Sequence, residues 1–504
     1  MSTMEAPLYR LRELLGFDLA GDSRSQAHNP QDILDGLGGL PAPVALQQLH
    51  EQYLLAVNAV RNRLERFNLL EKAQPEIENC LPVLERIVSD AILPLPAKIR
   101  AIALIADNCL KGFTNAYSSI VSHVSGSRLD AAQAELLQHA IYRAIQALFR
   151  RQILAYRAYA IPSPSSWQHL HDLYQIARGH GVANRGDDKN IEKIYLCALL
   201  MAYADPSKIP RHNLDALRQS IDFLVPFAGI VSVSDFNPSH ASLMGRFLVN
   251  SETGSPGLPL ARAGIHSKDP GNYIIECRGI INALDRKLAQ SLDAQHHIPE
   301  NVLVALRTAM EGQWTRRFAR LRFKPKAHLI AGMGNALSLI SAINEDKSLD
   351  EAMSSTSDWD ILNESPDGFG LRFRNGLRWQ VQAGDLVVLR IPDEKRLHIC
   401  LVRRISNRQS NKFDLGLQEL SPYASIIQLP APEGQASRQG IFLPNLPAYD
   451  RSAGLLIRSG TFSTSAVFRA AGSDGVSRLW RCTEHVENNG QVEFHVLKPA
   501  ESVT

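Results

Sequence analysis

The spacing of apolar residues changes near Trp314, and this change constrains the fold of the 504-residue chain more than any other feature. Before Trp314, apolar residues recur every three or four positions, as they do over residues 44–57, and the breaks carry proline or glycine. After Trp314, short strand-like runs are separated by turn sequences. The pattern predicts a multidomain α+β protein in which a helical bundle or solenoid-like region precedes antiparallel β structure.

The first part of the chain is expected to hold most of its residues in amphipathic helices. The ranges indicated by the apolar spacing are 76–94, 96–123, 129–160, 164–180, 190–204 and 213–226. Strand-like segments at 230–234 and 273–277 interrupt this pattern and flank a loop over 251–264 that is rich in glycine, proline and serine. No fixed repeat length emerges. We predict a single helical region over 1–312.

The second part is expected to form two β units. Five short runs between residues 328 and 420 suit a small barrel or sandwich, which we place at 313–430. Proline and glycine over 422–434 predict a linker. A small C-terminal β domain is predicted over 436–504, with a hairpin tip at 486–492.

Composition excludes some classes of function without selecting one. The chain has 54 Lys and Arg against 51 Asp and Glu, and a net charge of +3 argues against binding nucleic acid or membranes through bulk charge. No apolar run approaches the roughly 20 residues that span a bilayer, and the N-terminus lacks a signal-peptide pattern. The six widely spaced cysteines predict buried thiols and no zinc or redox pair. We therefore expect a cytoplasmic protein without a membrane span.

A basic strip opens the β part. Residues 316–326 hold six cations in eleven positions, and Arg316 and Arg320 have the spacing R-x-x-x-R. The same spacing recurs downstream in Arg374/Arg378 and Arg404/Arg408, so it is not specific by itself. A plainer interpretation of the strip is a solvated edge strand whose charges prevent aggregation.

A second motif, N-x-S-x-x-G, follows in a turn-rich segment and consists of Asn363, Ser365 and Gly368. A plain turn would use the same residue types. In this order, and in a β context, the two motifs resemble the signature of the PilZ domain, a barrel that binds cyclic di-GMP. The resemblance implies a six-stranded antiparallel barrel with cyclic di-GMP as its ligand and no other cofactor or metal. The implied ligand site comprises Arg316, Arg317, Arg320, Asn363, Ser365 and Gly368, and leaves open whether Arg316 or Arg317 pairs with Arg320.

The chemistry of the ligand fits these residue types. Arginine can bond guanine O6 and N7, bond phosphate oxygens and stack on a purine, and cyclic di-GMP offers all three. Asn363 and Ser365 offer short polar groups for a guanine edge, and Gly368 would allow a sharp turn or a positive φ. Trp359 and Phe369 are expected to be core residues. One departure from the family is the 43-residue distance from Arg320 to Asn363, where residues 336–343 predict an inserted helix.

The whole layout resembles the PilZ proteins with long helical arms that are tied to type IV pilus assembly and twitching, the FimW/TfpB type. This resemblance implies a non-enzymatic receptor that relays the cyclic di-GMP level to a protein partner through its helical region. It also implies regulation of pili, motility or biofilm formation, with recruitment to the cell pole or to inner-membrane machinery. Two alternatives stay open: a helical scaffold with a degenerate PilZ-like barrel, and a nucleic-acid-binding protein that uses the strip at 316–326. If the protein is a cyclic di-GMP receptor, we expect it to bind no nucleic acid.

Overall fold

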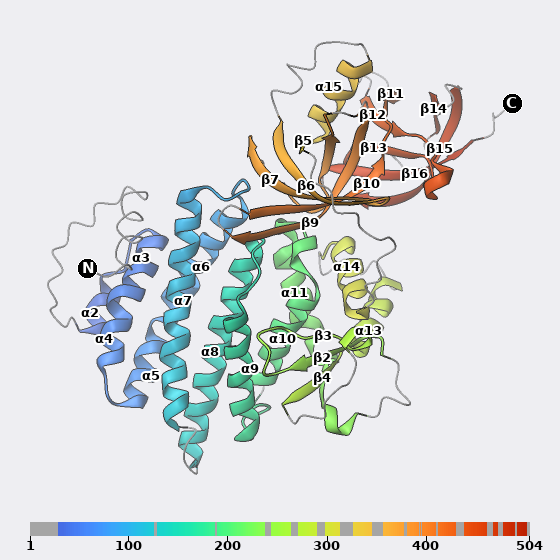
Figure 1. Cartoon of the computed structure of the whole chain (residues 1–504). Helices are drawn as coiled ribbons and strands as arrows, with labels where there is room; N and C mark the ends of the chain where they lie inside the picture. The colour runs from blue at the N-terminus through green and yellow to red at the C-terminus, as the bar shows by residue number, and fades with distance from the viewer. Residues whose placement is uncertain are drawn as a thin grey trace. The chain divides into compact units, whose positions relative to one another are not determined.

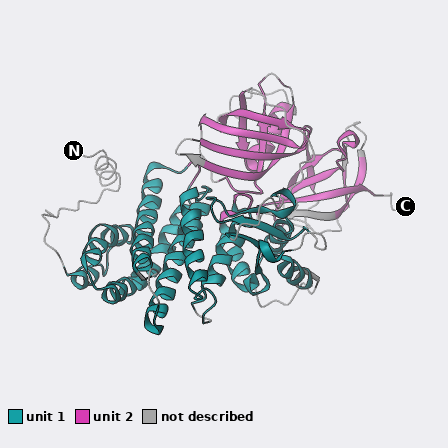
Figure 2. Ribbon diagram, turned by 60° about the horizontal axis from the view of Figure 1, so that its bottom comes forward, with its two compact units in different colours: residues 1–91, 95–206, 212–313 teal, residues 92–94, 207–211, 314–504 magenta. Residues whose placement is uncertain are grey.

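A computed structural model gives the fold of the protein and divides the chain into two compact units (Figure 2). Unit 1 holds residues 1–91, 95–206 and 212–313, and unit 2 holds residues 92–94, 207–211 and 314–504. The structure describes residues 29–124, 129–186, 189–236, 243–263, 271–289, 298–312, 326–344, 356–376, 381–392, 394, 396–409, 412–429, 438–460, 467–471, 477–488 and 491–500.

Unit 1 is mainly helical up to residue 227 (Figure 1). Its first elements are α2 (Pro30–Asp35), α3 (Ala42–Gln48), a π-helical turn (Leu49–Tyr53), α4 (Leu54–Ala59) and α5 (Arg63–Lys72). Longer helices follow: α6 (Gln74–Ser89), α7 (Ala97–Val124), α8 (Ala131–Arg157), α9 (Pro164–Gly179), α10 (Ile191–Tyr203) and α11 (Leu214–Leu224). These six confirm the helices expected from the apolar spacing, with the largest difference at the end of α6.

The long helices α7 and α8 pack along each other at the centre of unit 1 (Figure 1). Helices α3, α5 and α6 pack on α7, whereas α9 and α10 pack on α8. Polar residues at the predicted breaks begin the helices. Asp130 forms a capping box with Gln133 at the start of α8, and Ser163 Oγ accepts a hydrogen bond from Ser166 N at 3.2 Å at the start of α9.

A small antiparallel sheet completes unit 1. Its strands are β1 (Gly229–Ser232), β2 (Arg246–Asn250), β3 (Leu258–Pro259) and β4 (Asn272–Glu276), in the order β1-β4-β2-β3. They are accompanied by α12 (Leu260–Ala263), α13 (Arg278–Ala289) and α14 (Glu300–Glu311). Both predicted strand segments are confirmed, and they pair with each other as β1 and β4. The buried His171 bonds Ser255 O and Tyr195 Oη, both at 2.8 Å, so it holds the loop after β2 onto α9 and α10.

Unit 2 contains a closed antiparallel barrel, as the resemblance implied (Figure 1). Its strands are β5 (Lys326–Ala331), β6 (Ser357–Ser365), β7 (Gly368–Gly376), β8 (Leu386–Arg390), β9 (Leu397–Gln409) and β10 (Lys412–Ser421), in the order β10-β7-β6-β5-β8-β9. Trp359 fills the interior, 1% exposed, and packs against Phe373 and Phe413 with ring centroids 5.3 and 5.8 Å away. Phe369 is also buried, so both aromatic residues are core residues as expected.

A six-stranded sheet follows the barrel. Its strands are β11 (Ser425–Leu429), β12 (Arg438–Leu443), β13 (Gly454–Arg458), β14 (Val467–Ala471), β15 (Ser477–Asn488) and β16 (Val492–Pro499), in the order β11-β12-β13-β16-β15-β14. The prediction of a linker over 422–434 is wrong for the residues that form β11. An end of the barrel unit at residue 430 would place β11 in the barrel, whereas this strand belongs to the C-terminal sheet. β11 pairs with β12, the next strand along the chain. Prolines lie on both sides of β11, so a strand this short is hard to recognise from the sequence.

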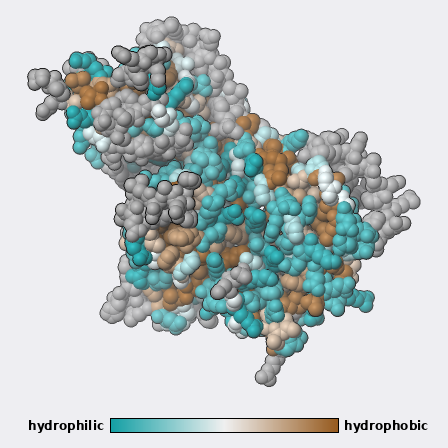
Figure 3. All heavy atoms as spheres, turned by 180° about the vertical axis from the view of Figure 1, so that it is seen from behind, coloured by the Kyte–Doolittle hydropathy of each residue, from teal (hydrophilic) through white to brown (hydrophobic). Residues whose placement is uncertain are grey.

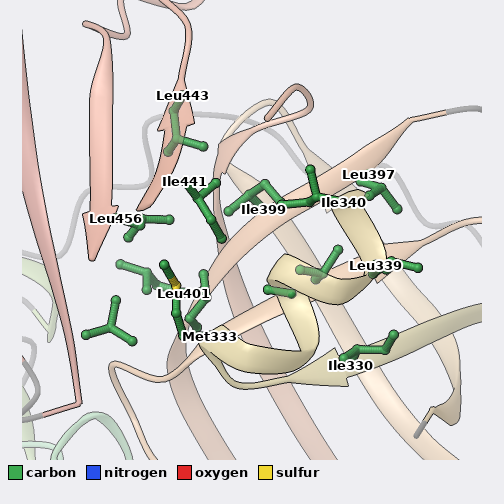
Figure 4. Packing of buried hydrophobic residues seen from close by; sticks show 14 residues of the cluster. Ile330, Met333, Leu339, Ile340, Leu397, Ile399, Leu401, Ile441, Leu443 and Leu456 are labelled. Carbon is green, nitrogen blue, oxygen red and sulfur yellow. The ribbon is translucent and has the colours of Figure 1, made fainter. Parts of the chain in front are cut away.

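Helix α15 (Met333–Asn344) is the helix that the long separation between the two motifs indicated. Its apolar face joins the barrel to the C-terminal sheet in one continuous core (Figure 4). The helix contributes Met333, Leu339 and Ile340; β8 and β9 contribute Leu386, Val388, Leu397, Ile399 and Leu401; β12, β13 and β16 contribute Ile441, Leu443, Leu456 and Val492. Because all these side chains are buried together, the two β units share their stability.

The thiols are all inside the protein. All six cysteines are unpaired and buried, which confirms the expectation of buried thiols. Burial raises the pKa of the Cys80 and Cys482 thiols to about 11, so neither is a ready nucleophile. Within the described ranges, no helix is both long enough and apolar enough to cross a membrane.

Candidate functional site

The N-x-S-x-x-G motif forms the hairpin between β6 and β7. Asn363 and Ser365 lie at the end of β6, Gly368 begins β7, and a two-residue turn of Pro366 and Asp367 joins the strands. Ser365 Oγ donates a hydrogen bond to Gly368 O at 3.3 Å. The turn is also bonded to β10, because Glu419 N donates to Asp367 O at 2.9 Å. The motif therefore lies in a fixed turn at one end of the barrel.

Gly368 has a structural reason to be glycine. Its φ of +144° lies in a region that L side chains rarely adopt, and a Cβ at this position would lie 2.0 Å from Leu417 O on β10. The positive φ predicted for this residue is confirmed. The close approach of β7 and β10 fixes the position of the hairpin tip relative to the neighbouring strands.

Two further glycines lie side by side on the outer face of the barrel. Across β6, β7, β10 and β9, Asn363 pairs with Gly370, Gly370 with Gly416, and Gly416 with Arg404. Leu371 and Leu415 point into the barrel, so the adjacent Gly370 and Gly416 point outward. A register shift between Ile361 and Asn363 brings Asn363 to the same outer face, opposite Gly370. We call the row of Asn363, Gly370, Gly416 and Arg404 the glycine shelf.

The glycine shelf has no side chain at its two middle positions, and the Asn363 amide lies over one of them, Gly370. A Cβ on Gly370 would lie 2.8 Å from the Asn363 amide, and a Cβ on Gly416 would lie 3.3 Å from Arg404 Cβ. Three steps between adjacent strands separate Asn363 from Arg404, which is about 14 Å at the usual strand spacing. Peptide planes without side chains allow a planar ring system to approach closely, and the side chains at both ends can bond its edges.

The rows beside the shelf carry ordered polar pairs. On one side, Arg372 binds Asp414 through two hydrogen bonds of 2.8 and 2.9 Å. On the other side, Arg403 Nε donates to Gln418 Oε1 at 2.7 Å. Arg404 Nε donates to Ser207 Oγ at 3.2 Å, within unit 2, which leaves its other guanidinium donors along the exposed face. The borders of the shelf are therefore polar and well oriented.

A buried ionic cluster lies beneath the hairpin tip. His398 Nδ1 bonds Glu419 Oε1 at 2.6 Å, and its Nε2 bonds Glu394 Oε2 at 3.2 Å. Burial alone would lower the pKa of His398, but Glu419 and Glu394 outweigh burial and raise it. Burial likewise acts to raise the pKa of Glu419, but His398 and Arg451 outweigh it and lower that pKa. Both residues are thus held in their charged forms.

Comparison with known protein families supports the resemblance over both parts of the chain. A family model described as "Cyclic-di-GMP receptor FimW, N-terminal domain" matches residues 29–233. A second model, described as "Cyclic-di-GMP receptor FimW, middle PilZ domain", matches residues 338–425. The two matches occur in the same order as in their descriptions; the first lies in the helical region, and the second covers the barrel except β5. The chain belongs to the FimW family.

One curated relative is the cyclic-di-GMP receptor FimW of Pseudomonas aeruginosa, which is 26% identical over 216 residues. The aligned part is 40% of this chain and 35% of the relative, so the chain spans about a third of that FimW protein's length. No solved structure matches the chain. The match to the middle domain of FimW contains the hairpin tip and the whole glycine shelf, and it ends within β11.

The predicted site residues differ in what the structure says about them. Asn363, Ser365 and Gly368 lie together at the hairpin tip. Arg316, Arg317 and Arg320 lie outside the described residues, as does the basic strip except Lys326, and the FimW middle-domain match begins after them. No cluster of three or more metal-ligating side chains occurs in the described part of the chain.

Sequence reasoning missed Gly370, Gly416 and Arg404 as parts of one row. It treated Arg404 as a chance match to the arginine spacing. A signal was available, since glycine within an alternating strand often marks a close approach of a ligand or backbone. Gly370 and Gly416 each lie between apolar neighbours in such strands. The register that brings them together, however, links strands that are far apart in sequence.

Proposed function

We propose that the chain is a receptor for cyclic di-GMP and that one face of the ligand rests on the glycine shelf. The observation that carries this proposal is the shelf itself: two adjacent outward-facing glycines, bordered by Asn363 and Arg404 and adjoining the N-x-S-x-x-G turn. Membership in a family whose models are described as a cyclic di-GMP receptor supports the choice of ligand.

The proposed contacts follow from the chemistry of the ligand. A guanine ring stacked on the peptide plane of Gly416 would present its edge to the Asn363 amide, which lies over Gly370. Among the described residues, none forms a hydrogen bond with that amide. Arg404 at the other end of the shelf supplies donors for a phosphate or for guanine O6 and N7. The arginines proposed to clasp the exposed face of the ligand are Arg316, Arg317 and Arg320.

Calorimetric titration of the full chain with cyclic di-GMP tests the ligand assignment. We expect saturable binding of cyclic di-GMP and none of GTP or cyclic AMP, which lack the paired guanines on one compact ring. No heat and no ligand-induced rise in Tm would contradict the proposal and would favour a scaffold with a degenerate barrel. Binding of single-stranded RNA or DNA in place of the dinucleotide would favour the nucleic-acid alternative.

The clasp arginines provide a separate prediction. Removing one arginine that bonds a desolvated phosphate or guanine edge costs about 1.5–3 kcal/mol, which weakens binding by roughly tenfold to a hundredfold. We expect this loss for Arg320→Ala, with little rescue by Arg320→Lys because a lysine cannot make the bidentate contact. Arg378→Ala and Arg408→Ala are the matched controls and should bind normally. Normal binding by Arg320→Lys would favour a loose electrostatic patch.

We further propose that residues 1–312 are the output region, acting without catalysis by contacting a protein partner. Support comes from the size of this region and from the match of 29–233 to a domain that precedes the PilZ domain in FimW. On the face shown in Figure 3, exposed hydrophobic residues occur in several separate groups among hydrophilic ones. The proposed readouts are pilus assembly, twitching and biofilm formation, with recruitment of a cytoplasmic protein to the cell pole or to inner-membrane machinery.

A cavity in unit 1 is a candidate place for such a partner. It measures about 420 Å³ and lies between α6, α7, α8, α10 and α11, with apolar residues such as Phe113 and Ile153 and with charged residues such as Arg143 and Lys193 in its lining. Substituting Ile153 and Lys193 in the full chain should abolish copurification of the partner while the affinity for cyclic di-GMP stays at the wild-type value. Loss of both would indicate misfolding, and loss of neither would move the partner site elsewhere.

A further inference from the structure

The C-terminal sheet reaches the ligand motif through one arginine. Arg451 Nη2 donates a hydrogen bond to Pro366 O, inside the N-x-S-x-x-G turn. Its Nη1 donates to Glu419 Oε2 at 3.2 Å and to Leu420 O at 3.4 Å on β10. The side chain is 15% exposed; its bonds to β10 are partly buried, whereas its bond to Pro366 O is exposed to solvent. A single guanidinium therefore ties the turn, the last barrel strand and the C-terminal sheet together.

The backbone around Arg451 holds this side chain in place. Leu446 and Arg451 exchange two backbone hydrogen bonds of 2.8 and 3.2 Å across a short 3₁₀ helix (Pro447–Tyr449). Asp450 completes the loop in a left-handed conformation with φ of 54°. The guanidinium lies 5.4 Å from the centre of the Tyr449 ring. The loop is thus a rigid support, which lowers the entropic cost of holding a long side chain in one geometry.

Glu419 is the second attachment of the turn. Its backbone N–H donates to Asp367 O, and its carboxylate bonds both His398 and Arg451. Pro366 and Asp367, the two residues of the turn, are therefore each held by one hydrogen bond from outside the hairpin. Without these bonds, the motif would still be held by the pairing of β7 with β6 and β10 and by the Ser365 hydroxyl, but neither turn residue would have a bond to the rest of the barrel.

We infer that Arg451 is a positioning residue for the ligand site and that the C-terminal sheet sets the affinity of the barrel for its ligand. This inference rests on the proposed function at the glycine shelf. Arg451 acts through Pro366 O, since it holds the turn on which Asn363 and Ser365 are presented. The matched family models end at residue 425, so they give the segment that carries Arg451 no role.

Two measurements on the full chain test the inference. Hydrogen–deuterium exchange reports the turn through peptides that cover residues 362–371, and calorimetry reports affinity for cyclic di-GMP. For Arg451→Ala we expect faster exchange in the turn and roughly tenfold weaker binding, with unchanged exchange in β12 and β13. Arg451→Lys keeps a charge beside Glu419 but cannot bridge to Pro366 O in the same way, so intermediate values are expected. Arg481→Ala, on an exposed part of β15, is the control and should match wild type in both measurements.

The outcomes are distinguishable. Wild-type exchange and wild-type affinity in Arg451→Ala would overturn the inference. If the alanine variant exchanges faster throughout the C-terminal sheet, Arg451→Lys decides: a change confined to the turn supports the inference, and no change in the turn overturns it. If the wild-type chain does not bind cyclic di-GMP, the proposed function fails, and the exchange of the turn still decides whether Arg451 positions the motif.

Discussion

At the scale of single residues, the candidate site depends on its two glycines, Gly370 and Gly416, as much as on its polar side chains. Gly370 and Gly416 are outward-facing positions in antiparallel strands, where β-branched residues would add stability. Glycine at both positions gives up that stability: Gly370 makes room for the Asn363 amide, and Gly416 leaves the backbone without a side chain beside Arg404. We propose that a flat face of the ligand approaches the peptide plane at Gly416, where a Cβ would meet only Arg404.

Replacing Gly416 by valine should separate folding from binding. The new Cβ would lie 3.3 Å from Arg404 Cβ, so the two strands must move apart by a few tenths of an ångström, a cost that the strand preference of valine offsets in part. We expect a small change in Tm but at least tenfold weaker binding of cyclic di-GMP, measured by calorimetry. Lys412→Val, an exposed position on the same strand, is the matched control. Equal affinities for wild type and Gly416→Val would show that the ligand does not use the shelf.

The buried pair of His398 and Glu419 should give the stability a defined pH dependence. The pKa of His398 is raised above its ordinary value of 6.5, so its contribution is complete below about pH 6.5 and is lost as the pH rises through the raised pKa. The pKa of Glu419 is lowered from 4.5, so its contribution is present above that pH and is lost when the pH falls through the lowered pKa. Arg451, Glu394 and Glu364 are the other charged groups that face this pair.

Chemical denaturation of the full chain between pH 4 and pH 9 tests this dependence. The free energy of unfolding should fall as the pH rises above 6.5, and His398→Gln should remove most of that fall. The substitution leaves the lysines and cysteines unchanged, so any decline that persists in the variant arises elsewhere. An unchanged pH profile in His398→Gln would mean that the imidazole is neutral in the folded protein.

At this scale, a feature of the site could be predicted from the sequence only where neighbouring residues determine it. The turn of Asn363, Ser365 and Gly368 was predictable because the motif lies within six consecutive residues and its glycine has a positive φ, whereas the close approach of Gly368 to Leu417 O was not. The shelf was not, since Gly370 and Gly416 meet only through the pairing of β7 with β10, 46 residues apart. Arg451 was out of reach for the same reason, as its partner Pro366 lies 85 residues away.

At the scale of elements, helices were easier to predict than strands. The ranges of α7 to α11 follow from apolar spacing and from caps such as Asp130 and Ser163, which all act within a few residues. β11 depends on β12 for its pairing and is only five residues long, so a segment that was predicted as a linker is a strand. In the small sheet of unit 1, the sequence indicated only β1 and β4. These two strands carry a strand-like pattern of apolar residues, and they pair with each other.

A partly buried ionic network joins three helices of unit 1 and gives a prediction at this scale. Glu71 on α5 accepts hydrogen bonds from Arg143 on α8, at 2.7 to 3.0 Å, and from Tyr117 on α7 at 2.8 Å. Glu71→Ala would leave the Arg143 charge without its carboxylate, at a cost of about 2 kcal/mol given the partial exposure of the pair. Urea unfolding measures this cost. Lys72→Ala, at the exposed neighbouring position, is the control, and equal losses in both variants would contradict the network's role.

At the scale of the whole molecule, the barrel and the C-terminal sheet should behave as one folding unit. The sequence predicted two β domains with a boundary near residue 430, because turn-forming residues gather there. The structure instead shows α15 buried between them, with Met333 and Ile340 against Ile441 and Leu456 (Figure 4). A helix inserted in the barrel segment and a sheet that follows the barrel bury each other's apolar surface, and neither sequence segment reveals that alone.

Truncation tests this shared core. A fragment of residues 314–504 retains both sides of the core and should unfold cooperatively, whereas a fragment of 314–424 leaves the apolar face of α15 exposed. Losing the contacts of several fully buried aliphatic residues costs more than the 5–15 kcal/mol by which a typical domain is stable. We therefore expect the shorter fragment to aggregate or to lack a cooperative transition in circular dichroism, and to bind no cyclic di-GMP. A shorter fragment with the Tm and affinity of 314–504 would show that the barrel is independent, and it would also remove the C-terminal sheet from any role in ligand binding.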